Sequence, residues 1–204
     1  MTRTLAVVSA GIGRPSSTRL LADRLALATT AALGSDVDTQ VVELREHGHD
    51  LVNHLVSGYP AAELELVLDL VARAAGLIAV TPTYAASFSG LFKTFVDVLD
   101  DEALVDKPVL LGATGGTGRH SLVLENAMRP LFTYLRAVVV PTSVFAAPED
   151  WAGAAAPDLL AHRVERAAGQ LAREISLRDA PVVPDPFDPP PLDRLLEYHP
   201  PGSR

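Results

Sequence analysis

The chain has 204 residues, of which 48% are hydrophobic and 5% aromatic, so it can bury a sizeable aliphatic core within one domain. A formal net charge of −8 without any basic run argues against a nucleic-acid-binding surface, because such surfaces cluster Lys and Arg. The absence of cysteine excludes disulfides, thiol chemistry and Cys-ligated metal sites.

Targeting and membrane signals do not stand out in the sequence. The apolar run near the N-terminus is too short for the central region of a signal peptide, and no stretch approaches the roughly 20 apolar residues that a membrane span requires. We therefore expect a cytoplasmic protein that binds no membrane.

The first informative segment is a short apolar run that leads into a loop rich in glycines and hydroxyls. The run Leu5–Val8 predicts a strand. In residues 19–33, apolar side chains recur every three or four residues, which predicts an amphipathic helix. Ser16, Ser17 or Thr18 can cap that helix. The N–H groups of its first turn, together with the helix dipole, favour a phosphate at this loop. Arg14 adds a positive charge.

This loop also admits other interpretations. Its glycines can simply build a tight connection while its hydroxyls only cap the helix. The segment lacks the Gly-Lys-Ser/Thr ending of nucleotide triphosphatases, and Ser16 stands where a dinucleotide fingerprint requires its third glycine. A mononucleotide phosphate therefore fits the loop better than a pyrophosphate.

The next segments predict a strand at the edge of a sheet and a polar connection. Asp38–Leu44 alternates polar and β-branched residues, which is typical of a strand with one less buried face. Residues 45–58 contain three histidines and Asp50. A helix here would place Asp50 and His54 on one face, but the other histidines do not join them at the spacing of zinc motifs. We predict a polar surface loop near a ligand site, with no bound metal.

A helix is predicted from Pro60 to about residue 75, followed by the apolar strand Leu77–Val80, which is typical of a strand buried on both faces of a parallel sheet. Residues 81–89 then form a predicted loop at the carboxyl end of that strand, where parallel sheets bind ligands. Tyr84 offers an aromatic plate with a polar tip. Ser87 or Ser89 can cap the helix that follows, whose aromatic residues we assign to the core.

The fourth predicted strand, Lys107–Ala113, also ends in a glycine-rich loop, residues 114–121. Its glycines allow close approach of the backbone to a ligand, and a flavin ring needs such backbone N–H donors. The residues 125–135 predict a helix, and residues 137–145 predict a fifth strand with Pro141 at its end or at a bulge.

The C-terminal part is predicted to contain a helix that begins at Pro157 and ends near Ile175. From Pro181 onward the proline density excludes regular structure. We therefore divide the chain into a domain of residues 1–180 and a Pro-rich tail of residues 181–204. The apolar side chains of the tail suggest that it lies across a neighbouring subunit.

The three loops together resemble those of the NAD(P)H-dependent FMN reductase family of flavodoxin-like proteins. The resemblance extends over about residues 3–177. Within the family, the chain most resembles the reductases that supply reduced FMN to luciferase-like monooxygenases. It implies an α/β fold, a flavodoxin-like three-layer sandwich with a five-stranded parallel sheet in the order 2-1-3-4-5. It also implies FMN as cofactor, NADPH or NADH as electron donor and a homodimer or homotetramer.

The resemblance assigns the following residues to the FMN site. They are Ser9, Arg14, Ser16, Ser17 and Thr18 at the phosphate; Pro82, Thr83, Tyr84 and Ser87 beside the ring and ribityl chain; and Thr114, Gly115, Gly116, Thr117 and Gly118 at the other edge of the ring. Arg119 and His120 are predicted to bind the phosphates of the nicotinamide nucleotide, although a salt bridge or a place at a helix start is an alternative for each.

The implied mechanism is hydride transfer from the nicotinamide to flavin N5, for which no side-chain acid or base is required. We therefore name no catalytic residue. Two alternatives remain open, which are a quinone, azo or chromate reductase that holds FMN tightly, and a flavodoxin-type electron carrier.

Overall fold

The computed structural model describes residues 3–34, 37–151 and 159–178, and it contains a parallel sheet in the order β2-β1-β3-β5-β6. These strands are β1 (Arg3–Ser9), β2 (Val37–Glu43), β3 (Gly76–Tyr84), β5 (Pro108–Thr114) and β6 (Val138–Val139). Without the additional short strands, the order is 2-1-3-4-5, which is that of flavodoxin-like sheets. The predicted fold class is therefore confirmed.

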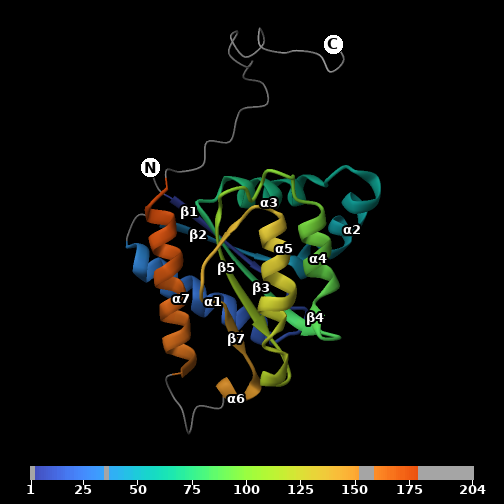
Figure 1. Ribbon diagram of the computed structural model, residues 1–204. Helices are drawn as coiled ribbons and strands as arrows, with labels where there is room; N and C mark the ends of the chain where they lie inside the picture. The colour runs from blue at the N-terminus through green and yellow to red at the C-terminus, as the bar shows by residue number, and fades with distance from the viewer. Residues whose placement is uncertain (1–2, 35–36, 152–158, 179–204) are drawn as a thin grey trace, which may run out of the picture.

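Helices cover both faces of the sheet, as Figure 1 shows. On one face, α1 (Ser17–Leu33) and α7 (Leu159–Ser176) bury Leu21, Leu25 and Leu171 against β1, β3 and β5. The opposite face is covered by α2 (Gly48–Ser57), α3 (Ala62–Arg73), α4 (Gly90–Asp97) and α5 (Arg129–Tyr134), whose buried side chains include Leu51, Leu64, Phe92 and Phe132. The two apolar clusters produce the expected three layers.

The burial of each strand follows from its place in the sheet. β5 is buried along its whole length, as expected for a central strand covered by helices on both faces. Exposed and less exposed residues alternate along most of β2, which among the described strands pairs only with β1, so the predicted edge position is confirmed.

The prediction of one continuous fifth strand over residues 137–145 is wrong. The structure has two short strands, β6 and β7 (Val144–Ala146), and both pair with β5 in parallel. Pro141 lies between them, where its missing N–H cannot join a ladder. The Arg129 guanidinium donates instead to the carbonyls of Val140 and Pro141, each at 3.2 Å. The break therefore keeps its acceptors paired.

The loop predicted after the third strand is a tight hairpin. β3 continues to Tyr84, and β4 (Ser87–Phe88) pairs antiparallel with it, with Tyr84 opposite Ser87. Ala85 and Ala86 form the turn with φ angles of 48° and 65°, the sign that two-residue hairpin turns require. The cap of α4 is Ser89, whose Oγ accepts from the Phe92 N–H at 3.2 Å.

The prediction of a polar loop over residues 45–58 is also wrong, because most of this segment is the helix α2. A short 3₁₀ turn, Leu44–Glu46, leads into α2, whose C-terminus is closed by Gly58 in the left-handed conformation. Leu51 is fully buried against the neighbouring helices, so tertiary packing selects the helix.

Several segments complete the description. Short helical turns occupy Gly118–His120, Leu124–Met128 and α6 (Pro148–Trp151). Across the described ranges, His, Asp and Glu side chains form no group of three or more that could hold a metal ion. None of the helices there combines the length and the hydropathy that crossing a membrane requires. The predicted start of the last helix at Pro157 and the Pro-rich tail lie outside the described residues.

Candidate functional site

A pocket of about 310 Å³ lies at the carboxyl ends of β1, β3 and β5. The strand registers explain its position, because Ser9 pairs with Val80 and Pro82 pairs with Thr114. Its lining consists of Gly11, Ile12, Gly13, Pro15, Ser16, Ser17, Thr18, Pro82, Thr83, Tyr84, Thr114, Gly115, Gly116 and Pro148. The three predicted loops therefore converge on one pocket, and its lining carries no formally charged side chain.

The first loop presents the N-terminus of α1 to the pocket. The Ser16 Oγ accepts from the Arg19 N–H at 3.2 Å and thereby caps the helix. The N–H groups of Ser17 and Thr18 belong to the first turn, where a helix provides no acceptor. Neutral donors at the positive end of a helix dipole suit an anion such as a phosphate.

Gly11 allows the first loop to fold closely over the start of α1. A Cβ atom at this position would lie 2.2 Å from the Ser16 Oγ and 2.9 Å from the Thr18 Cβ. Any larger residue would therefore push the loop away from the capped helix.

A buried hydrogen bond joins the first loop to the third. The Thr18 and Thr114 hydroxyl oxygens lie 2.8 Å apart, and both residues are almost fully buried. Because Thr114 pairs with Pro82 across β5 and β3, this bond fixes the separation of all three loops.

Two hydroxyls near the pocket have no hydrogen-bond partner among the described residues. They are the buried Oγ of Ser9, which ends β1, and the buried Oγ1 of Thr83 near the end of β3. A buried hydroxyl without a partner is unfavourable, so each favours a ligand that supplies polar atoms. FMN, with its phosphate and hydroxyl-bearing ribityl chain, fits these donors better than an apolar ligand does.

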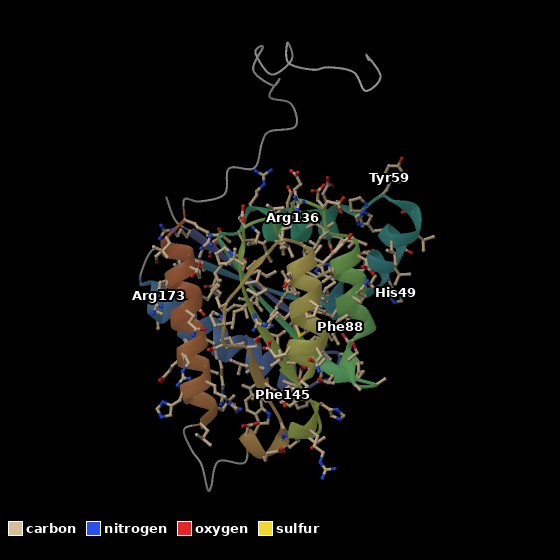
Figure 2. The ribbon with its side chains drawn as sticks, in the orientation of Figure 1. His49, Tyr59, Phe88, Arg136, Phe145 and Arg173 are labelled. Atoms are coloured by element: carbon tan, nitrogen blue, oxygen red, sulfur yellow. The ribbon has the colours of Figure 1, made fainter. Side chains whose placement is uncertain are left out.

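The third loop packs against β7 and leaves part of its backbone open. A Cβ on Gly115 would lie 2.8 Å from the Phe145 ring, whereas one on Gly116 would meet nothing within 4 Å. Figure 2 shows Phe145 at the same end of the molecule as α6. Gly115 therefore permits tight packing, and Gly116 leaves room at the pocket for a flat ring.

Five of the residues that the resemblance assigned to FMN do not line the pocket. Ser9 is buried beside it, and Ser87 lies in β4. The Gly118 N–H donates to Glu149 Oε1 at 3.2 Å, and the Thr117 Oγ1 caps the turn that contains Arg119 and His120. The Arg14 side chain is 76% exposed and lies 4.0 Å from Glu46.

Sequence reasoning missed a charged network that supports the first loop. The Arg45 Nη1 donates to the Gly13 carbonyl at 2.8 Å, and the same guanidinium pairs with Glu43. Glu43 also pairs with Arg19 at 2.6 Å, and the hydrogen bond between Arg19 and Asp23 raises the pKa of that guanidinium. Glu43 ends the predicted edge strand, which is the signal that could have placed it beside this loop.

Residues 3–152 match the sequence family described as NADPH-dependent FMN reductase, and these residues form most of the chain. The chain belongs to this family. The predicted family, the oxidoreductase class and the use of FMN with a pyridine nucleotide are confirmed by this membership.

Individual relatives agree with the family. The chain is 41% identical over 146 residues to "FMN reductase (NADPH)" of Pseudomonas aeruginosa, which covers 71% of this chain and 76% of that protein. It is 38% identical over 177 residues to "NADH-dependent FMN reductase SfnE" of Pseudomonas putida, with 87% and 89% covered. The crystal structure of an oxidoreductase from Corynebacterium diphtheriae has 44% identity and a TM-score of 0.84, covering 87% of this chain and 99% of that one.

Proposed function

We propose that this FMN reductase holds FMN in the pocket formed by the three loops and reduces it with NADPH or NADH. The observation that carries the proposal is the convergence of the α1 N-terminus, Tyr84 and the open backbone at Gly116 on one pocket. Each part suits a different part of the same molecule.

The residues present divide between the two ends of such a ligand. The N–H groups of Ser17 and Thr18 would hold the phosphate, and the unpaired hydroxyl of Thr83 would bind the ribityl chain, while Ser9, buried beside the pocket, stays a predicted phosphate contact. Tyr84, with 46% of its surface exposed, would contact the ring. Arg14, Ser87, Thr117 and Gly118 stay predicted contacts.

Bound FMN supplies the electron sink that accepts a hydride from the nicotinamide. The pocket lining has no Asp, Glu, His, Lys or Arg, so its side chains provide no charged acid or base. The contribution of the chain is then to bind the two reactants and orient them. Arg119 and His120, exposed in the turn beside the third loop, are proposed to bind the nucleotide phosphates.

Relatives that are named for NADPH and for NADH support either donor. We further propose that the reduced FMN leaves to serve a flavin-dependent monooxygenase, that the protein is a cytoplasmic homodimer or homotetramer, and that residues 1–180 form the reductase domain. The resemblance to reductases of two-component systems supports the partner.

The test mixes purified protein with NADPH or NADH, free FMN and air, and follows the absorbance of the pyridine nucleotide. We expect oxidation that depends on added FMN. The Gly116→Val variant should raise the KM for FMN by filling the open space above that backbone, while Gly169→Val on α7 should not. No oxidation would contradict the proposal. Oxidation that needs a quinone but no added FMN would indicate a different reductase.

A further inference from the structure

An apolar groove of about 490 Å³ lies between α1 and α7, which pack together on one face of the sheet (Figure 1). Its floor consists of small and aliphatic side chains, and two charged residues, Arg24 and Glu165, stand among them. The lining residues are Arg24, Leu27, Ala28, Ala31, Ala32, Ala161, Val164 and Glu165. The groove shares no lining residue with the pocket formed by the three loops.

Large apolar side chains lie exposed in and near this groove. Leu27, which lines it, is 75% exposed, and Leu159, two residues before the lining residue Ala161, is 66% exposed. Exposed apolar side chains at an apolar groove mark a place where another segment packs. A short amphipathic segment is a suitable occupant, because such a segment can place its apolar face in a groove between two helices.

The chain itself carries such a segment beyond the described residues. Leu192, Leu195 and Leu196 have the i, i+3, i+4 spacing of one helical face, and Asp193, Arg194 and Glu197 would occupy the opposite face. The Corynebacterium diphtheriae protein aligns over nearly its full length but leaves part of this chain without a counterpart. The family match covers residues 3–152, so this segment lies outside it and is free to serve a second purpose.

The segment can reach the groove of its own chain. The last described residue, Arg178, follows the C-terminus of α7, and Val164 lies about 21 Å back along that helix at 1.5 Å per residue. Residues 181–191 span about 34 Å when extended like polyproline. The proline-rich stretch is therefore long enough to return the leucines to the groove.

We propose that residues 192–198 dock into the groove between α1 and α7 of the same chain, with the three leucines against Leu27 and Val164. Charge supports this choice. Arg24 lines the groove and lies 4.8 Å from the centre of the Trp151 ring, so Asp193 or Glu197 of the docked segment can pair with its guanidinium. Tethering gives the segment a high local concentration at this groove.

The absence of native cysteine allows a direct test with the full chain. Ala161→Cys in the groove is combined with Leu195→Cys, and mild oxidation is followed by non-reducing electrophoresis and intact mass. The matched control combines Leu195→Cys with Leu66→Cys, which is 72% exposed on α3 in the other helical layer. We expect the groove pair to form an intramolecular disulfide at least about ten-fold faster. Equal rates would overturn the proposal.

Two further arms distinguish docking within one chain from docking between chains. Adding Leu192→Asp and Leu196→Asp to the groove pair should abolish its advantage, whereas Asp188→Ala, outside the apolar pattern, should retain it. An equal mixture of the two single-cysteine proteins should give no covalent dimer. A dimer would place the segment in the groove of a neighbouring subunit and overturn docking within one chain. FMN reduction is measured separately, so failure here leaves the reductase proposal intact.

Discussion

Tyr84 lies at the mouth of the pocket, on the last position of β3 before the hairpin turn. If its ring contacts the flavin, Tyr84→Ala should raise the Kd for FMN about two- to twelve-fold, since an aromatic pair contributes about 0.5–1.5 kcal/mol. Tyr84→Phe should bind like the wild type because it keeps the ring. Quenching of flavin fluorescence measures both. Unchanged binding by Tyr84→Ala would place the ring elsewhere.

Arg45 acts on the pocket through the Gly13 carbonyl and does not line it. Arg45→Met removes a charged hydrogen bond worth about 1.5–3 kcal/mol, so the loop should loosen and FMN affinity should fall about ten-fold. Arg45→Lys should recover part of the affinity. Arg73→Met, which breaks an exposed ion pair on α3, is the control and should leave the titration unchanged. A normal Kd for Arg45→Met would show that the loop holds its shape without this contact.

Lys107 is a buried cation at the C-terminus of α3. Its ammonium donates to the carbonyls of Ala72 and Ala74 at 2.9 and 2.6 Å, and burial lowers the pKa of Lys107 to about 8. The chain has only one other lysine, Lys93, so Lys93→Arg leaves a single lysine amine for NMR titration. We expect its midpoint near pH 8. A midpoint near that of an exposed lysine would contradict the desolvation.

The lowered pKa has a consequence for stability. Between about pH 8 and 10.5 the unfolded chain binds this proton and the folded protein does not, so the contribution of Lys107 to the free energy of unfolding rises with pH. Denaturant unfolding of the wild type and Lys107→Met is measured at both ends of this range. The free energy of unfolding of the wild type, relative to that of the variant, should increase with pH. At low pH the variant should suffer mainly from the two carbonyls that it leaves without a donor.

At the scale of elements, local patterns predicted the strands and helices whose burial repeats regularly. Apolar runs predicted the buried strands β1 and β5, and apolar residues at three- to four-residue spacing predicted the amphipathic helix α1. α2 was missed because its histidines dominate the pattern while one residue, Leu51, anchors it to other helices. The β3–β4 hairpin was missed because two alanines, not glycines, form its turn.

The break between β6 and β7 depends on a side chain from α5. Arg129 donates to the Ser143 hydroxyl at 2.9 Å besides the two carbonyls, and its guanidinium lowers the pKa of the Glu125 carboxyl. Arg129→Met should therefore reduce the free energy of unfolding by about 1–2 kcal/mol, because the part-buried Val140 carbonyl and Ser143 hydroxyl lose their donor. Chemical denaturation measures this effect. Arg136→Met, an exposed arginine on the same side of the sheet, serves as control. Equal stability of the two variants would assign no role to Arg129.

At the scale of the whole molecule, Gly76 sets the contact between the sheet and the α7 layer. A Cβ on this residue would lie 2.4 Å from Ile175 Cδ1, the far end of a flexible side chain. Gly76→Ala should cost about 1–3 kcal/mol of unfolding free energy through overpacking. Combined with Ile175→Val, which removes the offending methyl, the cost should be less than the sum of the two single effects. Strict additivity would show that the two residues do not touch.

The sequence was enough to predict where the site lies, but not the charged side chains that support its first loop. Parallel strands end at one edge, so hydroxyls and glycines after the first, third and fourth predicted strands were expected to meet. The ion pairs among Arg45, Glu43 and Arg19 join residues that are close only because β2 lies beside β1. Side-chain pairing across strands has no periodic signal in one sequence, which is why this network was found only in three dimensions.

The pocket is lined by loops at the carboxyl ends of the strands and by the last residues of β3 and β5, while the two apolar clusters lie along the length of the sheet. Substitutions at the open lining positions, such as Ile12 and Gly116, would therefore leave both apolar clusters intact. After a gene duplication, one copy of such a protein can acquire a new electron acceptor while it continues to fold as its ancestor did.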